Sequence, residues 1–300
     1  MELDKRVNGT TKLTGLIGNP VEHTVSPVLH NTLFTMMGMN GIYIPMKPDT
    51  DSLGNAVAGL KAAGFTGFNV TIPFKEAILE YLDVASEEVR LLGTANTVHI
   101  KDGRLIGHNT DGDGFIHAFR KQTGTDIRGK KVCVLGAGGT ARALAVKLAI
   151  EGAGRICIIN RTKPKADEIA EYINCSLAGV LKSGTHACTA AADSDEARCV
   201  LDRYDVIVNT TSAGMHPHTD SSPIKDDIRF LSRPIVYDVI YNPSETRLLR
   251  HARSKGCVAV NGAGMLFFQG LRSFEIWMGV CVPEKIVEDL LTEFLNYLTV

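Results

Sequence analysis

The residues best suited to chemistry form a glycine-rich turn near the middle of the chain. An apolar run over residues 132–135 leads directly into this turn, and an apolar helical pattern follows it. In such a turn the first glycine permits a tight bend, the second lets the backbone approach a pyrophosphate, and a small third residue allows helix and strand to pack closely. The N-terminus of the helix adds free N–H groups and a positive dipole end. The turn predicts a dinucleotide site, with a methyltransferase as the alternative. Its candidate cofactor residues are Gly136, Ala137, Gly138 and Gly139.

The end of the next expected strand, residues 155–159, bears on the choice between NAD and NADP. An NAD site usually has an acidic residue here to hold the ribose 2′-hydroxyl. This chain has Asn160, followed by Arg161, Thr162 and Lys165. A guanidinium and an ammonium group suit a 2′-phosphate. The positive charges of Arg161 and Lys165 oppose the dipole of the helix that begins here, so a purely structural role explains these two residues less well. The residues favour NADP, with NAD as the alternative.

Polar residues also cluster in the first third of the chain, where α/β sheets place ligands at strand ends. Taken singly, each residue has a structural explanation. Ser26 suits a helix N-cap, Lys75 a solvated first turn, Asn96 a turn and Asp111 another cap. The clusters cover residues 23–27, 69–75, 95–97 and 107–112.

In this order, the clusters resemble the shikimate dehydrogenase family, which has the quinate/shikimate dehydrogenases as close relatives. The most specific pieces are Asn-Val-Thr-Ile-Pro-Phe-Lys at residues 69–75 and Asn-Thr-Asp-Gly at residues 109–112. The resemblance extends from about residue 13 to the C-terminal helix. It includes further motifs at residues 136–142, 160–162, 209–215, 238–243 and 262–265.

The resemblance implies a role for each matching position. Lys75 and Asp111 would be the catalytic pair, and the hydroxyl groups of Thr24 and Ser26 would hold the substrate carboxylate. The ring hydroxyls and the pocket lining would fall to Thr71, Asn96, Tyr241 and Gln269. The cofactor residues would include Thr211, with Val239 and Gly262 near the nicotinamide and Met265 near the ring face.

The implied reaction is the reversible, NADP-dependent reduction of 3-dehydroshikimate to shikimate in the chorismate pathway of aromatic amino acid biosynthesis. NADP⁺ would accept the hydride and neutral Lys75 the hydroxyl proton. One departure from the family matters, because its usual Ser-x-Ser is here Thr24-Val25-Ser26. By the resemblance, the additional methyl group would reshape the pocket around the carboxylate carbon, where quinate carries an extra hydroxyl. A quinate/shikimate dehydrogenase that uses NAD or NADP therefore stays open.

The elements that position these residues can be read from the pattern of apolar residues. Short apolar runs alternate with amphipathic stretches along nearly the whole chain, which predicts alternating strands and helices and so an α/β protein with mostly parallel sheets. We expect an α/β substrate domain over residues 1–112, completed by C-terminal helices within residues 263–300. A Rossmann-type NADP domain over residues 113–262 would follow, with a cleft between the two. Local expectations include a helix capped by Ser26, a strand at residues 68–72, a helix at 75–82, a hairpin at 97–107, and a loop with part of a helix at 183–198.

Composition narrows the class of protein. The hydrophobic fraction is 44% and the net charge is −1, which predicts a normal core and argues against nucleic-acid binding. Seven scattered cysteines include no C-x-x-C pair, so neither a disulfide framework nor a zinc site is expected. The first ten residues and the apolar runs indicate neither a signal peptide nor a membrane span. We expect a cytoplasmic monomer or homodimer that acts on a small molecule.

Three other interpretations fit less well. Tyr43 and Lys47 match the Tyr-x-x-x-Lys pattern of short-chain dehydrogenases, but they precede the glycine turn and flank Pro45. A zinc alcohol dehydrogenase would need ligands that the chain lacks, and we expect no metal at His216 and His218. A non-catalytic NADP-binding regulator is disfavoured because Lys75 and Asp111 are both present.

Overall fold

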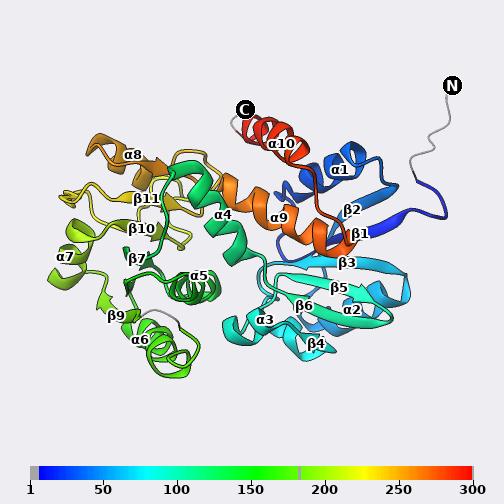
Figure 1. The fold of residues 1–300 in the computed structure, drawn as a ribbon, viewed down its shortest axis with the longest axis horizontal. Coiled ribbons are helices and arrows are strands. Elements are labelled where there is room, and N and C mark those ends of the chain that lie inside the picture. Colours follow the sequence, from blue (N-terminus) through cyan, green and yellow to red (C-terminus); the bar gives the residue numbers. More distant parts are fainter. Residues whose placement is uncertain (1–6, 182–183, 299–300) are drawn as a thin grey trace. The chain divides into compact units, whose positions relative to one another are not determined.

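The computed structural model describes residues 7–181 and 184–298, which form two compact units (Figure 1). The first comprises the described part of Met1–Thr110 together with Phe267–Phe294. The second comprises Asp111–Leu266 and the described part of Leu295–Val300. Each unit contains a six-stranded sheet covered by helices, as an α/β sequence requires.

The sheet of the first unit is mixed, with strand order β2-β1-β3-β5-β6-β4. Strands β2, β1 and β3 are parallel, whereas β5 runs antiparallel to β3 and to β6. The strands are β1 (Lys12–Ile17), β2 (Gly41–Met46), β3 (Phe65–Val70), β4 (Val84–Ala85), β5 (Thr97–Lys101) and β6 (Arg104–His108).

Alternating side chains give this sheet two apolar faces. Leu16 packs with Trp277 on one face, whereas its neighbour Ile17 packs with Leu53 and Phe68 on the other. The first face lies against α1 and the later part of α9, and the second lies against α2, η2 and α3 (Figure 1). These elements are α1 (Ser26–Met36), η1 (Thr50–Ser52), α2 (Leu53–Ala62), η2 (Ala77–Tyr81), α3 (Glu87–Leu92), α9 (Ala263–Met278) and α10 (Glu284–Tyr297).

The sheet of the second unit is fully parallel, with strand order β12-β11-β10-β7-β8-β9. This is the doubly wound order of a Rossmann fold, in which the strand order reverses beside the first strand, here β7. The strands are β7 (Lys131–Leu135), β8 (Arg155–Asn160), β9 (His186–Ala191), β10 (Val206–Asn209), β11 (Ile235–Asp238) and β12 (Ala259–Val260). The expected α/β fold with mostly parallel sheets is confirmed.

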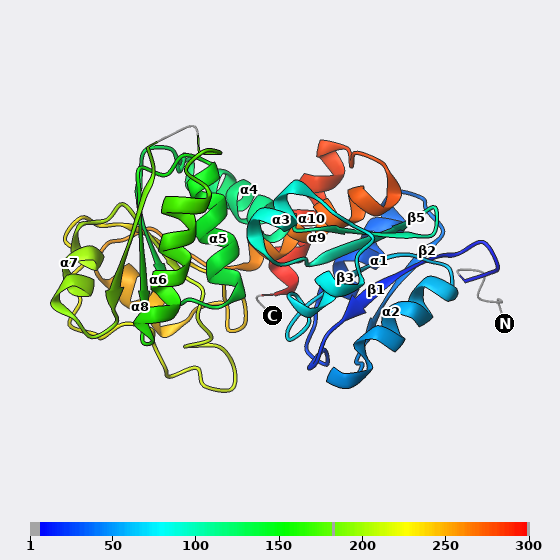
Figure 2. The ribbon, with the colours of Figure 1, turned by 90° about the horizontal axis from the view of Figure 1, so that it is seen from below.

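Helices cover both faces of this second sheet, as its apolar strands require. Figure 2 shows α5 and α6 side by side on one face. Side chains of α7 and α8 pack with Cys133 and Cys157 on the other. The helices are α4 (Asp111–Thr123), α5 (Gly139–Ile150), α6 (Lys163–Glu171), η3 (Tyr172–Ser176), α7 (Asp195–Arg203) and α8 (Arg247–Ser254).

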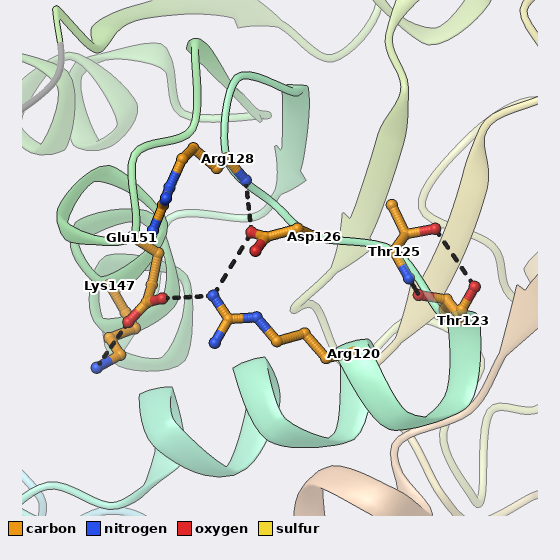
Figure 3. Close-up of polar contacts among 7 residues, drawn as sticks. All are labelled: Arg120, Thr123, Thr125, Asp126, Arg128, Lys147 and Glu151. Carbon is orange, nitrogen blue, oxygen red and sulfur yellow. Dashed lines mark hydrogen bonds and ion pairs between the residues drawn. The ribbon is translucent and has the colours of Figure 1, made fainter.

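A charged cluster fixes the connection from α4 to β7 (Figure 3). Arg120 donates to Glu151 at 2.9 Å and to Asp126 at 3.5 Å, and Asp126 also accepts from the Arg128 backbone N–H at 2.9 Å. Glu151 forms a second ion pair with Lys147 at 3.4 Å. The cluster ties the C-terminal ends of α4 and α5 together.

Some local expectations were wrong. Ser26 is not an N-cap, because the helix already includes it and Val25 occupies the cap position without a side-chain bond. Asp111 likewise begins α4 as its first helical residue. The strand expected at residues 68–72 is β3 (Phe65–Val70), which starts earlier and ends before Pro73.

Two other segments differ more. The expected helix at residues 75–82 is only the short 3₁₀ helix η2. The stretch 183–198, of which Ser183 lies outside the described residues, contains strand β9 and the start of α7. The small residues of β9 carry little strand signal, and it is pairing with β8 that makes them a strand.

In the described part of the chain, no helix is both long and apolar enough to span a membrane.

Candidate functional site

Hydroxyl groups at the start of α1 belong to a polar network in the first unit. The Thr24 hydroxyl donates to Ser26 Oγ at 3.2 Å, and the Ser26 backbone N–H donates back to Thr24 Oγ1 at 3.3 Å. The Tyr43 hydroxyl, whose pKa burial raises, also lies beside Ser26. That hydroxyl donates to Asn69 Oδ1 at 2.9 Å, at the end of β3. The hydroxyl groups of Thr24 and Ser26 therefore lie next to the polar groups in the middle of the sheet.

The amide of Asn69 extends the network toward β5 and α9. Its Nδ2 donates to the carbonyl of Asn96 at 3.1 Å, to Thr97 Oγ1 at 3.1 Å and to Ser273 Oγ at 3.0 Å. Ser273 in turn donates to the backbone carbonyl of Gln269 at 3.0 Å. Asn69 is only 6% exposed, so these bonds fix a buried polar centre.

Asn96 and Gln269 meet directly in this network. Asn96 Nδ2 donates to Gln269 Oε1 at 3.3 Å and to Thr110 Oγ1 at 2.9 Å. Asn96 Oδ1 accepts from the Thr110 backbone N–H at 2.8 Å. Two bonded pairs of residues with implied substrate roles therefore flank the polar groups of Tyr43 and Asn69. They are Thr24 with Ser26 and Asn96 with Gln269.

Backbone contacts place Thr71 and Lys75 beside these residues. The Thr71 N–H donates to the Ile17 carbonyl at 2.9 Å, and the Lys75 carbonyl accepts from the Ala95 N–H at 2.9 Å. A side chain at Gly18 would bring its Cβ within 2.2 Å of Thr71 Cγ2, so the glycine makes room for Thr71. Lys75 is thus held at the segment that leads into Asn96.

Asp111 and Tyr241 belong to the second unit. Asp111 directly follows Thr110, begins α4 and is 6% exposed. Tyr241 follows β11, and burial raises the pKa of its hydroxyl. The network described above is built from residues of the first unit, so a place for these two side chains beside the substrate stays a prediction.

The glycine turn of the second unit has the geometry that a dinucleotide needs. Gly136 has φ +109°, and a Cβ there would lie 2.8 Å from Thr210 Oγ1, so glycine is required. A Cβ at Gly138 would meet nothing within 4 Å, which leaves the backbone open to a ligand. Gly138 is the N-cap of α5, and Gly139 begins the helix. Ala141 is fully buried against the sheet, which satisfies the need for a small residue there.

The end of β8 presents cations beside this turn. Asn160 Nδ2 donates to the Thr162 carbonyl at 2.9 Å, which fixes the bend into α6. Lys163 is paired with Asp167 at 2.7 Å. Arg161 and Lys165 are exposed, and among the residues that the structure describes neither forms an ion pair. These two cations fit a phosphate dianion.

Strands β10 to β12 bring the remaining cofactor candidates to the same carboxyl edge. Asn209 Oδ1 accepts from the Thr211 N–H at 3.0 Å and from its hydroxyl at 2.8 Å. The Val239 N–H donates to the Asn209 carbonyl at 3.0 Å. A Cβ at Gly262 would lie 2.0 Å from the Val239 carbonyl oxygen, so only glycine permits this approach. Met265 follows in the first turn of α9 and is buried.

Several site residues escaped the sequence interpretation. Asp238 accepts from Asn209 Nδ2 at 2.9 Å and from the Thr246 hydroxyl at 2.7 Å, and burial raises the pKa of its carboxyl group to about 6. Asn69 was predicted only as part of a motif, although a polar residue in an apolar strand itself indicates a buried hydrogen-bonding site.

Tyr43 and Lys47, which match the short-chain dehydrogenase pattern, have separate partners in the structure. Tyr43 bonds to Asn69, and Lys47 pairs with Glu22.

Comparison with known proteins identifies both units. Residues 16–98 match the family model described as the shikimate dehydrogenase substrate binding domain. Residues 118–222 match the model described as shikimate / quinate 5-dehydrogenase.

Whole-chain relatives agree with the two family models. A protein of Methanopyrus kandleri named shikimate dehydrogenase (NADP(+)) is 40% identical over 296 residues, which cover 99% of this chain and 100% of the relative. The shikimate 5-dehydrogenase of Listeria monocytogenes, solved with shikimate and NAD, has a TM-score of 0.85 at 35% identity, covering 96% of this chain and 99% of that one. The Thermus thermophilus enzyme, solved with NADP(H) and shikimate, has a TM-score of 0.81 at 31% identity, covering 95% and 100%.

The two matched domains, the identity along nearly the whole length and the shared fold agree with each other, and the chain belongs to the shikimate dehydrogenase family.

Proposed function

We propose that this chain is an NADP-dependent oxidoreductase that interconverts 3-dehydroshikimate and shikimate. The observation that carries the proposal is the polar cluster centred on buried Tyr43 and Asn69, with the bonded pair of Thr24 and Ser26 on one side and the bonded pair of Asn96 and Gln269 on the other. It presents hydroxyl and amide groups in fixed positions, as a polyhydroxylated ring with a carboxylate requires. The first unit would hold the substrate and the second unit the cofactor.

The cofactor part of the proposal depends on the second unit. When bound, NADP⁺ supplies a hydride acceptor. The open backbone at Gly138 and the N-terminus of α5 would hold the pyrophosphate. Arg161 and Lys165 would hold the 2′-phosphate, which distinguishes NADP from NAD.

The proton part of the proposal assigns Lys75 as the acid/base group. In the direction of oxidation, Lys75 Nζ would accept the proton of the reacting hydroxyl, and Asp111 would orient the amine. Thr24 and Ser26 would hold the carboxylate and so fix which ring hydroxyl faces the lysine. The buried side chains around Asn69 would exclude water from the ring of the bound substrate.

Quinate is the second candidate substrate. It is favoured by the match of residues 118–222 to a shikimate / quinate model. The Thr24 methyl group opposes it by taking up space beside the carboxylate carbon.

Two further expectations remain predictions, namely that the protein is a monomer or homodimer and that it is located in the cytoplasm. Sedimentation would test the oligomeric state.

One assay tests the proposed activity. Formation of reduced cofactor is followed by absorbance with shikimate or quinate, each with NADP⁺ or NAD⁺. We expect the highest kcat/KM for shikimate with NADP⁺. Absence of turnover in all four combinations by a natively folded chain would refute the proposal.

A variant pair tests the role of Lys75. Lys75→Ala should reduce kcat by about 100-fold or more, the size of a general acid/base contribution, with KM for shikimate nearly unchanged. Lys101→Ala, at the exposed end of the β5–β6 hairpin, is the matched control and should keep full activity. Equal kcat values for the two variants would remove Lys75 from the mechanism.

A further inference from the structure

Three cysteines lie in a row across the second sheet. In the strand register Cys133 of β7 is opposite Cys157 of β8, and Cys157 is opposite Cys188 of β9. Cys133 and Cys157 belong to the apolar cluster on the face covered by α7 and α8, and Cys188 packs against the same cluster. The three thiols therefore share one face, although they are far apart in the sequence.

The three thiols differ in access to solvent. Cys133 and Cys157 are fully buried, at 0% and 1% exposure. Cys188 is partly exposed, because β9 is the edge strand of the sheet. A small oxidant can therefore reach Cys188 first, whereas Cys157 lies behind it.

Polar groups around Cys188 favour its thiolate. The thiol of Cys157 and the guanidinium of Arg155 lie close to Cys188, and the Tyr204 hydroxyl lies 3.8 Å from Cys188 Sγ. These groups, the Cys157 thiol foremost, lower the pKa of Cys188 against the opposing effect of burial. The same interaction between the two thiols, together with burial, raises the pKa of Cys157, so Cys157 keeps its proton. The row thus pairs a thiolate with a neutral thiol.

We propose that Cys188 and Cys157 form a reversible thiol–disulfide site, in which Cys188 reacts with a hydroperoxide and Cys157 resolves the product. In the first step Cys188 Sγ attacks the terminal oxygen of the hydroperoxide, the O–O bond breaks, and the remaining alkoxide (hydroxide in the case of hydrogen peroxide) leaves with the electron pair. Cys188 becomes a sulfenic acid. In the second step Cys157 Sγ attacks Cys188 Sγ, the S–O bond breaks, and water leaves with the proton of Cys157. A dithiol reductant reverses the change by exchange.

Strand spacing explains why Cys157 is the partner. Neighbouring strands lie about 4.8 Å apart, within the Cα separation of about 4.4–6.8 Å that a disulfide spans. Cys133 is two strands away from Cys188, at about 9.6 Å, which exceeds the limit of about 7 Å. Cys188 therefore has one resolving thiol within this row.

Peptide mapping after hydroperoxide treatment tests the proposal without substrate or cofactor. The untreated protein and the protein treated under native conditions are alkylated, digested and compared by mass spectrometry. We expect a peptide that links Cys157 to Cys188 after treatment and its loss on addition of a dithiol. A natively folded, treated protein with no such peptide would overturn the proposal.

Single substitutions separate the role of Cys188 as the thiol that reacts with the peroxide from that of Cys157 as the resolving thiol. Cys157→Ser, which removes the resolving thiol and keeps a hydrogen-bond donor beside Cys188, should stop the reaction at a sulfenic acid on Cys188, which a dimedone tag detects, and circular dichroism checks the fold. Cys133→Ala and Cys199→Ser should still form the link, since Cys133 is too distant and Cys199 is an exposed thiol on α7. A Cys157→Ser protein with a native spectrum but no tag on Cys188 would count against the assigned order of steps.

The pH dependence of alkylation tests the role of the neighbouring cation. The alkylation rate of Cys188 should change little between pH 7 and 8, whereas that of an ordinary exposed thiol rises nearly tenfold. Arg155→Gln should make the Cys188 rate rise more steeply in this range. A Cys188 rate in the unsubstituted protein that follows pH as steeply as Cys199 would contradict the proposal.

Discussion

A buried histidine in the first unit links stability to pH. His30 on α1 is 1% exposed and stacks on Tyr43 with ring centroids 4.2 Å apart. Trp277 and Phe274 pack against it from α9, at 5.3 and 6.5 Å. Burial among these rings lowers the pKa of His30 from its ordinary value of 6.5 to about 3. The ring is therefore neutral in the native protein at every pH above this value.

The sign and size of the effect follow from proton linkage. Below pH 6.5 the unfolded chain binds a proton at His30 and the native chain does not. The free energy of unfolding therefore decreases as the pH is lowered from 6.5 to about 3. Each pH unit in this window removes about 1.4 kcal/mol, so His30 accounts for a loss of about 2 kcal/mol between pH 7.5 and pH 5.

The substitution His30→Phe should abolish this part of the pH dependence, because phenylalanine keeps an aromatic ring on Tyr43 and does not titrate. Urea unfolding at pH 7.5 and pH 5, followed by a signal from the first unit such as Trp277 fluorescence, gives the difference in free energy. The control His186→Gln replaces an exposed histidine. Between pH 7.5 and pH 5 its free energy of unfolding should decrease by as much as that of the unsubstituted protein. The reasoning is refuted if His30→Phe loses stability equally, or if the His30 imidazole resonances titrate near pH 6.5.

The remaining predictions concern the proposed sites. Asn69→Ala should lower the free energy of unfolding by about 1–3 kcal/mol for each buried partner left unpaired, such as the Tyr43 hydroxyl, and raise KM for shikimate. Denaturant unfolding and steady-state kinetics would measure both, and no change in either would contradict the network. Arg161→Ala should raise KM for NADP⁺ about 10- to 100-fold, the effect of one charged hydrogen bond, and leave KM for NAD⁺ unchanged. Equal changes for the two cofactors would argue against a 2′-phosphate contact. Thr24→Ser should raise the kcat/KM ratio of quinate to shikimate, and an unchanged ratio would show that the methyl group does not select the substrate.

Hydrophobic patterning and turn chemistry were enough to predict most of the fold. The β5–β6 hairpin was expected from Lys101-Asp102-Gly103, and the structure places Asp102 and Gly103 at φ 49° and 70°. Such left-handed residues are what a tight hairpin turn needs. Strand β9 was missed, because small side chains at a sheet edge have no strong periodicity. The 3₁₀ helix η2 was expected to be a longer helix, because its apolar spacing fits either form.

For the candidate site, the sequence supplied the residue types and the order of the motifs. The phosphate-binding turn was readable because its constraints are local, as the positive φ of Gly136 shows. The buried centre at Asn69 was not, since its bond to Ser273 joins residues 204 positions apart.

The sequence by itself determined the α/β class, the glycine turn and the cations after β8, because each depends on neighbouring residues along the chain. The tertiary structure decided which polar groups share a network and which thiols share a face. Cys157 and Cys188 are aligned by the register of β8 and β9, and Asn96 meets Gln269 through the packing of α9. Register and packing are set by many weak contacts between distant segments, and no local pattern encodes them.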